Sequence, residues 1–291
     1  MGKRTSGLSL SIAVAAALSA LLATAAIAAT IVGTDGRDQI TGTPQDDQID
    51  AKDGNDRVRA LDGDDDVLGG RGKDRLFGSN GDDDVNGLQD GDLIVGNAGN
   101  DRLVGDVPRK GDRISKDRVF GGVGTDIVIG GDGKDRLHGG PDADRILGNA
   151  DRDLISGGTG DDESRGRPGN DLIFANLGVD ETFGGTGHDD LWALARGDVQ
   201  PPPTGGVDET GDTLHGESGD DRFHTRDGEV DRIDCGKGED DARLDMVDVI
   251  VDATPEDPDG SCERVKRREP KPDADDEENA TESPAADSLE G

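Results

Sequence analysis

The residues best placed to do chemistry in this chain are aspartates that recur at a fixed spacing. One stands at every ninth position from Asp38 to Asp101, and the same stride resumes from Asp117 to Asp189. A large aliphatic residue follows two positions later, except at Ser164 and Thr182. Regular rows of carboxylates suit a hard divalent cation such as Ca²⁺, which takes about six to eight oxygen ligands.

The elements that must position these aspartates are short strands separated by turns. The three residues centred on each aliphatic alternate outward, inward and outward, which predicts a minimal strand with one apolar side chain facing inward. The Gly- and Asp-rich residues between these strands predict turns, because glycine tolerates positive φ. No single unit can bury its one aliphatic side chain, so the units must stack on one another.

The best-formed units resemble the calcium-binding nonapeptide Gly-Gly-x-Gly-x-Asp-x-U-x of the RTX, or haemolysin-type, family, where U is a large aliphatic. They are residues 69–77, 121–129, 130–138 and 184–192. The resemblance covers Gly33 to Trp192, with weaker copies around Asp212 and Asp221. It implies an all-β fold, a right-handed parallel β-roll (a β-solenoid) in which two units make one turn and strands stack at about 4.8 Å.

The resemblance also implies that several Ca²⁺ ions lie between stacked turns, and hence between units two apart in the sequence. The candidate metal ligands are Asp38, Asp47, Asp56, Asp65, Asp74, Asp83, Asp92, Asp101, Asp117, Asp126, Asp135, Asp144, Asp153, Asp162, Asp171, Asp189 and Asp221. The expected pairs are Asp74 with Asp92, Asp117 with Asp135, Asp126 with Asp144, and Asp135 with Asp153. The strongest candidates are Asp126, Asp135 and Asp144.

Some units depart from the motif. Ala51-Lys52 and Ala60-Leu61 replace the leading glycine pair, so these turns are expected to bind weakly or to remain empty. Ala175-Asn176 does the same before Asp180. Some aspartates are expected only to cap their own turns. The arginines that follow many of the aspartates are expected to point outward and to provide solubility and weak ion pairs.

Composition limits the function classes that remain. The 291 residues contain 32 Lys and Arg against 66 Asp and Glu, a formal net charge of −34, with 30% hydrophobic and 2% aromatic residues. A large aromatic core is excluded, and a nucleic-acid partner is not expected because the surface would repel a polyanion. The alternative to a calcium-held roll is a largely disordered acidic polyelectrolyte that binds cations diffusely.

The first residues predict export. Lys3 and Arg4 precede an apolar run from Leu8 to Ala29, which is typical of a secretory signal peptide over residues 1–28. The protein is therefore expected to be secreted and extracellular, with no stable membrane insertion after cleavage. The alternative is an N-terminal membrane anchor with the repeats facing outward.

The repeats divide the chain into segments. We expect a first repeat block over 30–105, an insertion over 106–116, a second block over 117–192, a linker over 193–211, loose repeats with a cap over 212–265, and a disordered acidic tail over 266–291. The two cysteines, Cys235 and Cys262, both lie in the cap. In an exported chain they favour a disulfide, and two free thiols are the alternative.

Motifs for catalysis are missing from the sequence. It contains no His-Glu-x-x-His zinc pattern, no Gly-x-Ser-x-Gly nucleophile turn and no twelve-residue EF-hand loop. No catalytic residue is assigned, and the chain is expected to be a non-enzymatic structural or binding module. A toxin or hydrolase accessory protein is a weaker alternative. A cell-surface, glycan or protein ligand is a further candidate partner.

Overall fold

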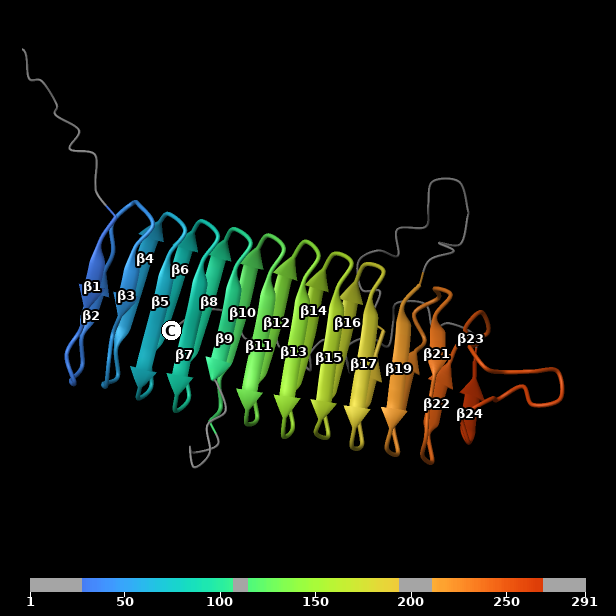
Figure 1. Cartoon of the computed structure of the whole chain (residues 1–291). Coiled ribbons are helices and arrows are strands. Elements are labelled where there is room, and N and C mark those ends of the chain that lie inside the picture. The colour runs from blue at the N-terminus through green and yellow to red at the C-terminus, as the bar shows by residue number, and fades with distance from the viewer. Residues whose placement is uncertain (1–27, 107–114, 194–210, 269–291) are drawn as a thin grey trace, which may run out of the picture.

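Two facing sheets build a long parallel solenoid (Figure 1). The structure is a computed structural model and describes residues 28–106, 115–193 and 211–268. These residues form 24 strands, arranged as two sheets of twelve parallel strands. Odd-numbered strands make one sheet, here the odd sheet, and even-numbered strands make the other, the even sheet. The predicted all-β parallel roll is therefore confirmed.

The strand bounds follow the nonapeptide stride. The odd sheet contains β1 (Thr30–Val32), β3 (Gln48–Asp50), β5 (Asp66–Arg71), β7 (Asp84–Gln89), β9 (Arg102–Asp106), β11 (Ile127–Asp132), β13 (Arg145–Ala150), β15 (Glu163–Pro168), β17 (Glu181–Thr186), β19 (Thr213–Ser218), β21 (Arg232–Asp234) and β23 (Val249–Ile250). The even sheet contains β2 (Gln39–Thr41), β4 (Arg57–Asp62), β6 (Arg75–Asn80), β8 (Leu93–Ala98), β10 (Arg118–Val123), β12 (Arg136–Pro141), β14 (Leu154–Thr159), β16 (Leu172–Leu177), β18 (Asp190–Trp192), β20 (Arg222–Thr225), β22 (Asp241–Leu244) and β24 (Arg264–Arg267).

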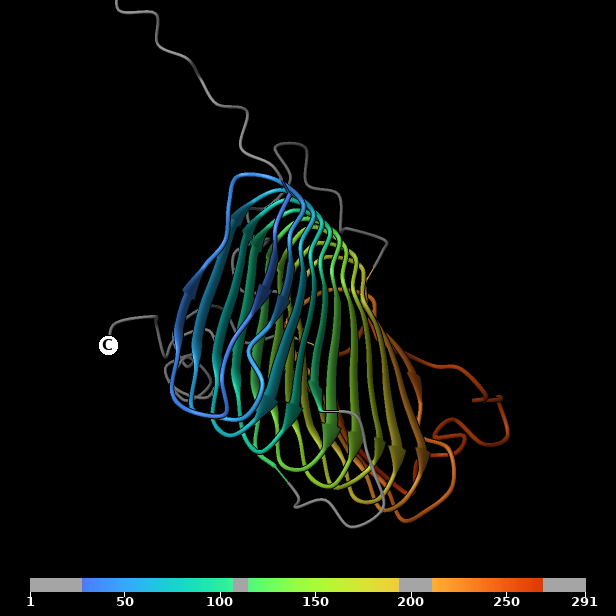
Figure 2. The same cartoon turned by 60° about the vertical axis from the view of Figure 1, so that its left-hand side comes forward.

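The two sheets face each other along the whole roll (Figure 2). A single column of aliphatic side chains from each sheet fills the narrow space between them. In β4 the side chain of Val58 has no exposed surface, whereas its neighbours Arg57 and Arg59 are exposed. Val58 is in register with Leu76 of β6, eighteen residues later. Two nonapeptides therefore make one turn, as predicted, and each turn adds two aliphatic side chains to a continuous core.

Most strands are longer than the three residues predicted. In β4, β5 and β6, among others, the strand runs for six residues and includes the glycine pair or its substitutes. The pairing of β11 with β13 continues past the aliphatic to Gly131 and Asn149. The prediction of a minimal strand was wrong because these turn residues also pair with the next turn, which satisfies their backbone groups.

The two predicted repeat blocks and the loose repeats form one stack. Strand β8 pairs with β10, and β9 pairs with β11, across the insertion predicted at 106–116. Strand β17 pairs with β19 across the linker predicted at 193–211. Most of both segments lies outside the described residues, as do the predicted signal peptide up to residue 27 and the predicted tail after residue 268.

The core is interrupted by two polar residues on neighbouring strands. Ser164 of β15 and Thr182 of β17 are in register and occupy inward positions, each with 2% or less of its surface exposed. Neither hydroxyl has a hydrogen-bond partner. The aliphatic cluster that starts near Ile49 ends at Ile173, and a second cluster begins at Leu191.

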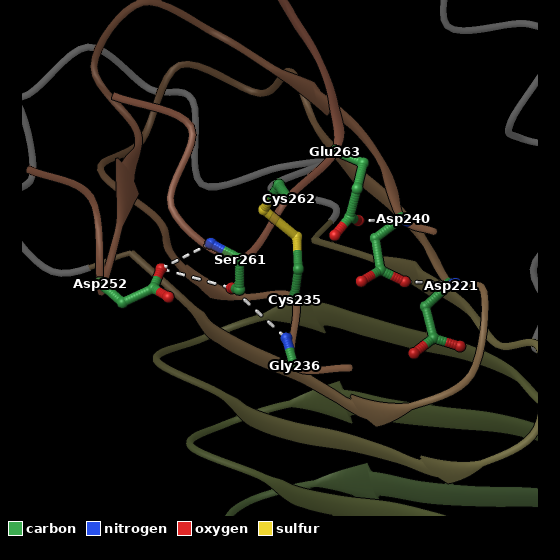
Figure 3. Close-up of a disulfide and its surroundings, with 8 residues drawn as sticks. All are labelled: Asp221, Cys235, Gly236, Asp240, Asp252, Ser261, Cys262 and Glu263. Atoms are coloured by element: carbon green, nitrogen blue, oxygen red, sulfur yellow. Dashed lines mark hydrogen bonds between the residues drawn. A yellow bond between two sulfur atoms is a disulfide. The ribbon is translucent and has the colours of Figure 1, made fainter. Parts of the chain in front are cut away.

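A disulfide closes the C-terminal end of the stack (Figure 3). It joins Cys235 and Cys262, which confirms the predicted pairing, and their Cα atoms are 5.3 Å apart. Both cysteines are buried within the second aliphatic cluster. Closing a loop of this length stabilises a fold by about 3.6 kcal/mol in the chain-entropy model.

The part of the chain that the structure describes contains no helix long and apolar enough to cross a membrane.

Candidate metal centre

Two rows of aspartates run along the two edges of the roll, and each aspartate directly precedes a strand. The first row, which leads into the even sheet, contains Asp38, Asp56, Asp74, Asp92, Asp117, Asp135, Asp153, Asp171, Asp189, Asp221 and Asp240. The second row, which leads into the odd sheet, contains Asp47, Asp65, Asp83, Asp101, Asp126, Asp144, Asp162, Asp180, Asp212, Asp231 and Asp248. All of them except Asp38 are buried.

Each row is tied together by one repeated hydrogen bond. The backbone N–H of Asp126 donates to Oδ1 of Asp144 at 2.7 Å, and that of Asp135 donates to Oδ1 of Asp153 at 2.9 Å. The same bond spans the insertion, where the N–H of Asp92 donates to Asp117 at 2.6 Å. The residues predicted as calcium pairs are therefore consecutive members of one row.

The second carboxylate oxygen of most row members is left without a partner. Seventeen of these aspartates have a buried Oδ2 atom that accepts no hydrogen bond. They are Asp56, Asp65, Asp74, Asp83, Asp92, Asp101, Asp126, Asp135, Asp144, Asp153, Asp162, Asp171, Asp180, Asp189, Asp221, Asp231 and Asp240. Because buried polar atoms are almost always satisfied, seventeen equivalent exceptions point to a missing ligand of positive charge.

In most units the backbone of the leading glycine packs closely against this oxygen, where a side chain would not fit. A Cβ atom placed on Gly130 would lie 2.6 Å from Oδ2 of Asp135 and 2.8 Å from the carbonyl oxygen of Gly148 in the next turn. A carboxylate oxygen and a carbonyl oxygen thus flank the same small space, and neither can donate a hydrogen bond to the other. Such an arrangement attracts a cation.

Burial raises the pKa of most row carboxyls in the middle of the roll far above the ordinary value for aspartate. It raises the pKa of Asp135 to about 7, that of Asp144 to about 8 and that of Asp153 to about 9. Neighbouring carboxylates of the same row add to the rise, while the backbone hydrogen bond from the preceding member opposes it. The ionised row is therefore costly unless a cation lies against it.

Oxygen donors of this kind suit Ca²⁺. Among the described residues, no group of three or more His, Cys, Asp or Glu side chains converges on one point. A zinc-type side-chain cage is therefore not what these residues form. A site in the rows would combine one or two row carboxylates with main-chain carbonyl oxygens of the glycine-rich turns, such as that of Gly148.

Comparison with known protein families decides what the repeat is. The profile of the RTX calcium-binding nonapeptide repeat, which spans four copies, matches residues 28–58, 59–94, 77–107, 120–155, 156–191 and 208–240. The chain belongs to the RTX calcium-binding nonapeptide-repeat family. No curated protein matches it. The RTX matches extend over both repeat blocks and reach the loose repeats up to residue 240, and β22, β23 and β24 continue the same two sheets beyond them.

Three of the seventeen predicted ligands differ from the other fourteen. Thr34 donates to Oδ2 of Asp38 from its backbone N–H at 2.6 Å and from its hydroxyl at 2.9 Å. Thr43 likewise donates to both oxygens of Asp47. The hydroxyl of Ser115 donates to Oδ2 of Asp117 at 2.9 Å. These carboxylates cap their own turns, while the other fourteen keep the unpartnered Oδ2, and their role as ligands stays a prediction.

Five aspartates of the two rows, and Glu263 at the end of the first row, were missed as candidates; the aspartates are Asp180, Asp212, Asp231, Asp240 and Asp248. Asp180, Asp231 and Asp240 carry the same unpartnered Oδ2, and Glu263 ends the first row by accepting the N–H of Asp240 at 2.8 Å (Figure 3). The signal was present as an acidic residue two positions before an apolar one, as in Asp231 and Ile233. Around Asp231, Asp240 and Glu263 it was overlooked because loops of irregular length break the stride of nine, whereas Asp180 lies within the stride but belongs to a unit that departs from the motif at Ala175-Asn176 and Thr182.

The units with alanine keep the backbone shape of the glycine units. Lys52 and Leu61 follow Ala51 and Ala60 and have φ of 78° and 98°, so they take the left-handed conformation that glycine takes elsewhere. Ala51 and Ala60 have no exposed surface. They stand at the position in their units that Gly130 holds in its own, and weaker binding at these turns stays a prediction.

At the cap, the carboxylates of Asp248, the last member of the second row, and of Asp245 are satisfied by the protein itself. Oδ2 of Asp248 accepts the hydroxyl of Thr225 at 2.6 Å and the N–H of Asp245 at 2.8 Å. The carboxylate of Asp245 accepts the N–H groups of Gly228 and Val247. These side chains hold the cap together and resemble the capped Asp38 and Asp47 more than the open rows.

Proposed function

We propose that this RTX protein is a secreted, non-enzymatic calcium-binding β-roll whose folding is coupled to the ion, and that it serves outside the cell as a structural or binding module. One observation supports this function above all. Two rows of buried carboxylates have an unpartnered Oδ2 on seventeen members, each beside a glycine-rich turn. A disordered polyelectrolyte would not need a buried aliphatic at nearly every unit, so the roll is the better account.

The coupling follows from the charge of the rows. In the folded chain the row aspartates of one edge stack at about 4.8 Å per turn, and like charges at that distance repel one another. The ion removes this repulsion and supplies the missing partner of Oδ2. Because binding of a ligand to the folded state alone stabilises it, Ca²⁺ would drive folding by mass action.

The ligand assignment is tested with the triple variant Asp126→Asn, Asp135→Asn, Asp144→Asn. Asparagine keeps the Oδ1 acceptor of the row hydrogen bond but removes the charge. We expect isothermal titration calorimetry to show fewer bound Ca²⁺ ions, and the calcium midpoint of folding to rise by at least about tenfold.

The matched control removes three charges from the outer surface, with Asp50→Asn, Asp66→Asn and Asp84→Asn in the odd sheet. These side chains face solvent and belong to neither row. Calcium binding should stay unchanged in the control. Equal calcium binding by the two triple variants would contradict the assignment.

The cellular part of the proposal is tested separately. Expression in a host that recognises the leader should release a protein whose mature N-terminus lies near residue 29, measured by mass spectrometry of the culture medium. Retention of the uncleaved chain in the membrane would favour the anchored alternative. Purified protein should show no activity in hydrolase and membrane-lysis screens, and clear activity in either would contradict the non-enzymatic assignment.

A further inference from the structure

The outer faces of the two sheets differ in charge, and neither resembles the chain as a whole. Each face is formed by the residues on either side of the inward position. On the even sheet these residues include nine basic and two acidic side chains, and on the odd sheet they include four basic and six acidic ones. The basic residues of the even face are Arg57, Arg59, Arg75, Arg118, Arg136, Arg222, Arg243, Arg264 and Lys266. A net positive surface is unexpected on a chain of net charge −34.

On the even face, the arginines nearest the N-terminal end of the roll form no ion pair with a carboxylate. In the described part of the chain, Arg57, Arg59, Arg75 and Arg118 make no ion pair, although 66 acidic residues are available in the sequence. All four are exposed. Towards the C-terminal end, by contrast, Arg222 lies 3.7 Å from Asp190 and Lys266 lies 3.5 Å from Asp241.

Aromatic rings stand between these arginines. The guanidinium carbon of Arg57 lies 5.7 Å from the ring centroid of Phe77, and that of Arg118 lies 5.7 Å from the ring of Phe120. On the same sheet the aromatic column continues with Phe174, which is fully buried, and with Trp192 and His224, whose rings stack at 3.7 Å. The rings restrain the arginines without satisfying their N–H donors, so the face is prepared for an extended anion.

We propose that the acidic C-terminal segment of the same chain, residues 269–291, docks on this even face. The segment carries nine Asp and Glu side chains and one Lys. It follows directly after β24, which is itself the last strand of the even sheet. Charge and position therefore match within one molecule, and the proposal does not depend on the calcium function.

The segment is long enough to reach the unpaired arginines. Strand β10, which carries Arg118, lies seven strands from β24 in the even sheet, or about 34 Å at 4.8 Å per strand. The acidic run 273–278 ends ten residues after Arg268, and ten extended residues span about 33 Å. The remaining residues to 291 can continue towards β4, about 48 Å from β24.

An intramolecular anion is favoured over one from outside. A free polyanion must approach a molecule of net charge −34, and this repulsion slows and weakens its binding. A tethered segment has already been brought near the face, at an effective concentration in the millimolar range.

The test uses the full chain, saturated with Ca²⁺ so that the roll is folded, in a variant with a neutral tail: Asp273→Asn, Asp275→Asn, Asp276→Asn, Glu277→Gln and Glu278→Gln. A labelled synthetic peptide of residues 269–291 is titrated, and fluorescence anisotropy is measured at low salt. We expect saturable binding to the tail-neutral chain that weakens as salt is added. Binding to the wild-type chain should be at least about tenfold weaker, because its face is occupied.

Two further triple variants, each in the tail-neutral chain, locate the site. Arg57→Gln, Arg75→Gln and Arg118→Gln on the even face should weaken peptide binding by at least about tenfold. Arg102→Gln, Arg145→Gln and Arg232→Gln on the odd face are the matched control and should leave it unchanged. Circular dichroism confirms that both remain folded. Absence of peptide binding, or equal loss in the two triple variants, would overturn the proposal.

The alternative occupant, an anionic chain from outside, gives a different result. A polyuronate oligomer that binds the wild-type chain as tightly as the tail-neutral chain would overturn the proposal, because an occupied face must resist it. The single tryptophan, Trp192, lies on this face between β24 and β10 and reports on the wild-type chain directly. Acrylamide should quench its fluorescence less in the wild-type chain than in the tail-neutral chain.

Discussion

In the seventeen row aspartates with an unpartnered Oδ2, the two carboxylate oxygens have different tasks. Oδ1 accepts the backbone N–H of the row member one turn earlier, as Asp144 does from Asp126, and so links successive turns. Oδ2 faces the space beside the leading glycine and has no protein partner. One side chain thus serves both the stacking of the roll and the proposed binding of the ion.

The raised pKa values of the row predict how pH acts on the chain. Burial raises the pKa of Asp126 to about 7 and that of Asp180 to about 9, from 3.8. Without calcium the folded chain therefore holds protons that the unfolded chain releases. This contribution to stability is complete below about pH 4 and is lost as the pH rises through 7 to 9.

In EDTA, we expect more β-structure at pH 5 than at pH 8, measured by far-UV circular dichroism. Calcium must displace the same protons, so its affinity should be at least about tenfold higher at pH 8 than at pH 6. An apo chain that gains β-structure as the pH rises would contradict the raised pKa values.

The substitution Ala175→Gly tests the role of the leading glycine. Ala175 precedes Asp180, whose Oδ2 is unpartnered, and it stands at the position in its unit that Gly130 holds in the unit of Asp135. We expect Ala175→Gly to raise the calcium affinity or the number of ions bound, measured by isothermal titration calorimetry. Gly130→Ala should lower them. Unchanged binding in both folded variants would show that this position does not affect the ion.

Among the elements, the paired strands β15 and β17 form the weakest part of the core. Their inward positions hold Ser164 and Thr182, which separate two aliphatic clusters and leave two buried hydroxyls without partners. An unsatisfied buried hydroxyl is destabilising by about 1–3 kcal/mol. The stack therefore has a local minimum of stability near the middle of its second half.

Thr182→Val removes one of these hydroxyls at nearly constant shape. We expect the free energy of unfolding to rise by about 1–2 kcal/mol, measured by urea denaturation at saturating Ca²⁺. Thr225→Val is the matched control, because the hydroxyl of Thr225 donates to Asp248 at 2.6 Å. That variant should lose stability by a similar amount. Destabilisation by Thr182→Val would show that its hydroxyl is satisfied in solution.

At the scale of the whole molecule, the sequence predicted the architecture because one pattern repeats. The nine-residue spacing of Asp126 and Asp135, with Val128 and Leu137 two positions later, sets the strands, the turns and the buried column together. The stacking partner then follows at eighteen residues. The rule failed where loops change the spacing, so Asp231 and Glu263 were missed although each takes its place in a row.

The positive charge of the even face was not predicted from the sequence. Arginines such as Arg57, Arg75 and Arg118 follow row aspartates, and each was treated as an isolated surface charge. They fall on the same sheet because they belong to alternate units. Pairing distances and the unpartnered Oδ2 atoms, in contrast, depend on three-dimensional packing and are not present in the sequence pattern.

The most direct test of the central claim is a calcium titration of residues 30–291, followed by far-UV circular dichroism with Mg²⁺ as the control. We expect a cooperative change from coil to β-structure at about 10⁻⁴–10⁻³ M Ca²⁺ and none with Mg²⁺, which is too small for this ligand set. A chain that stays coil-like at millimolar Ca²⁺, or shows the full β signal in EDTA at pH 8, would contradict an ion-held roll.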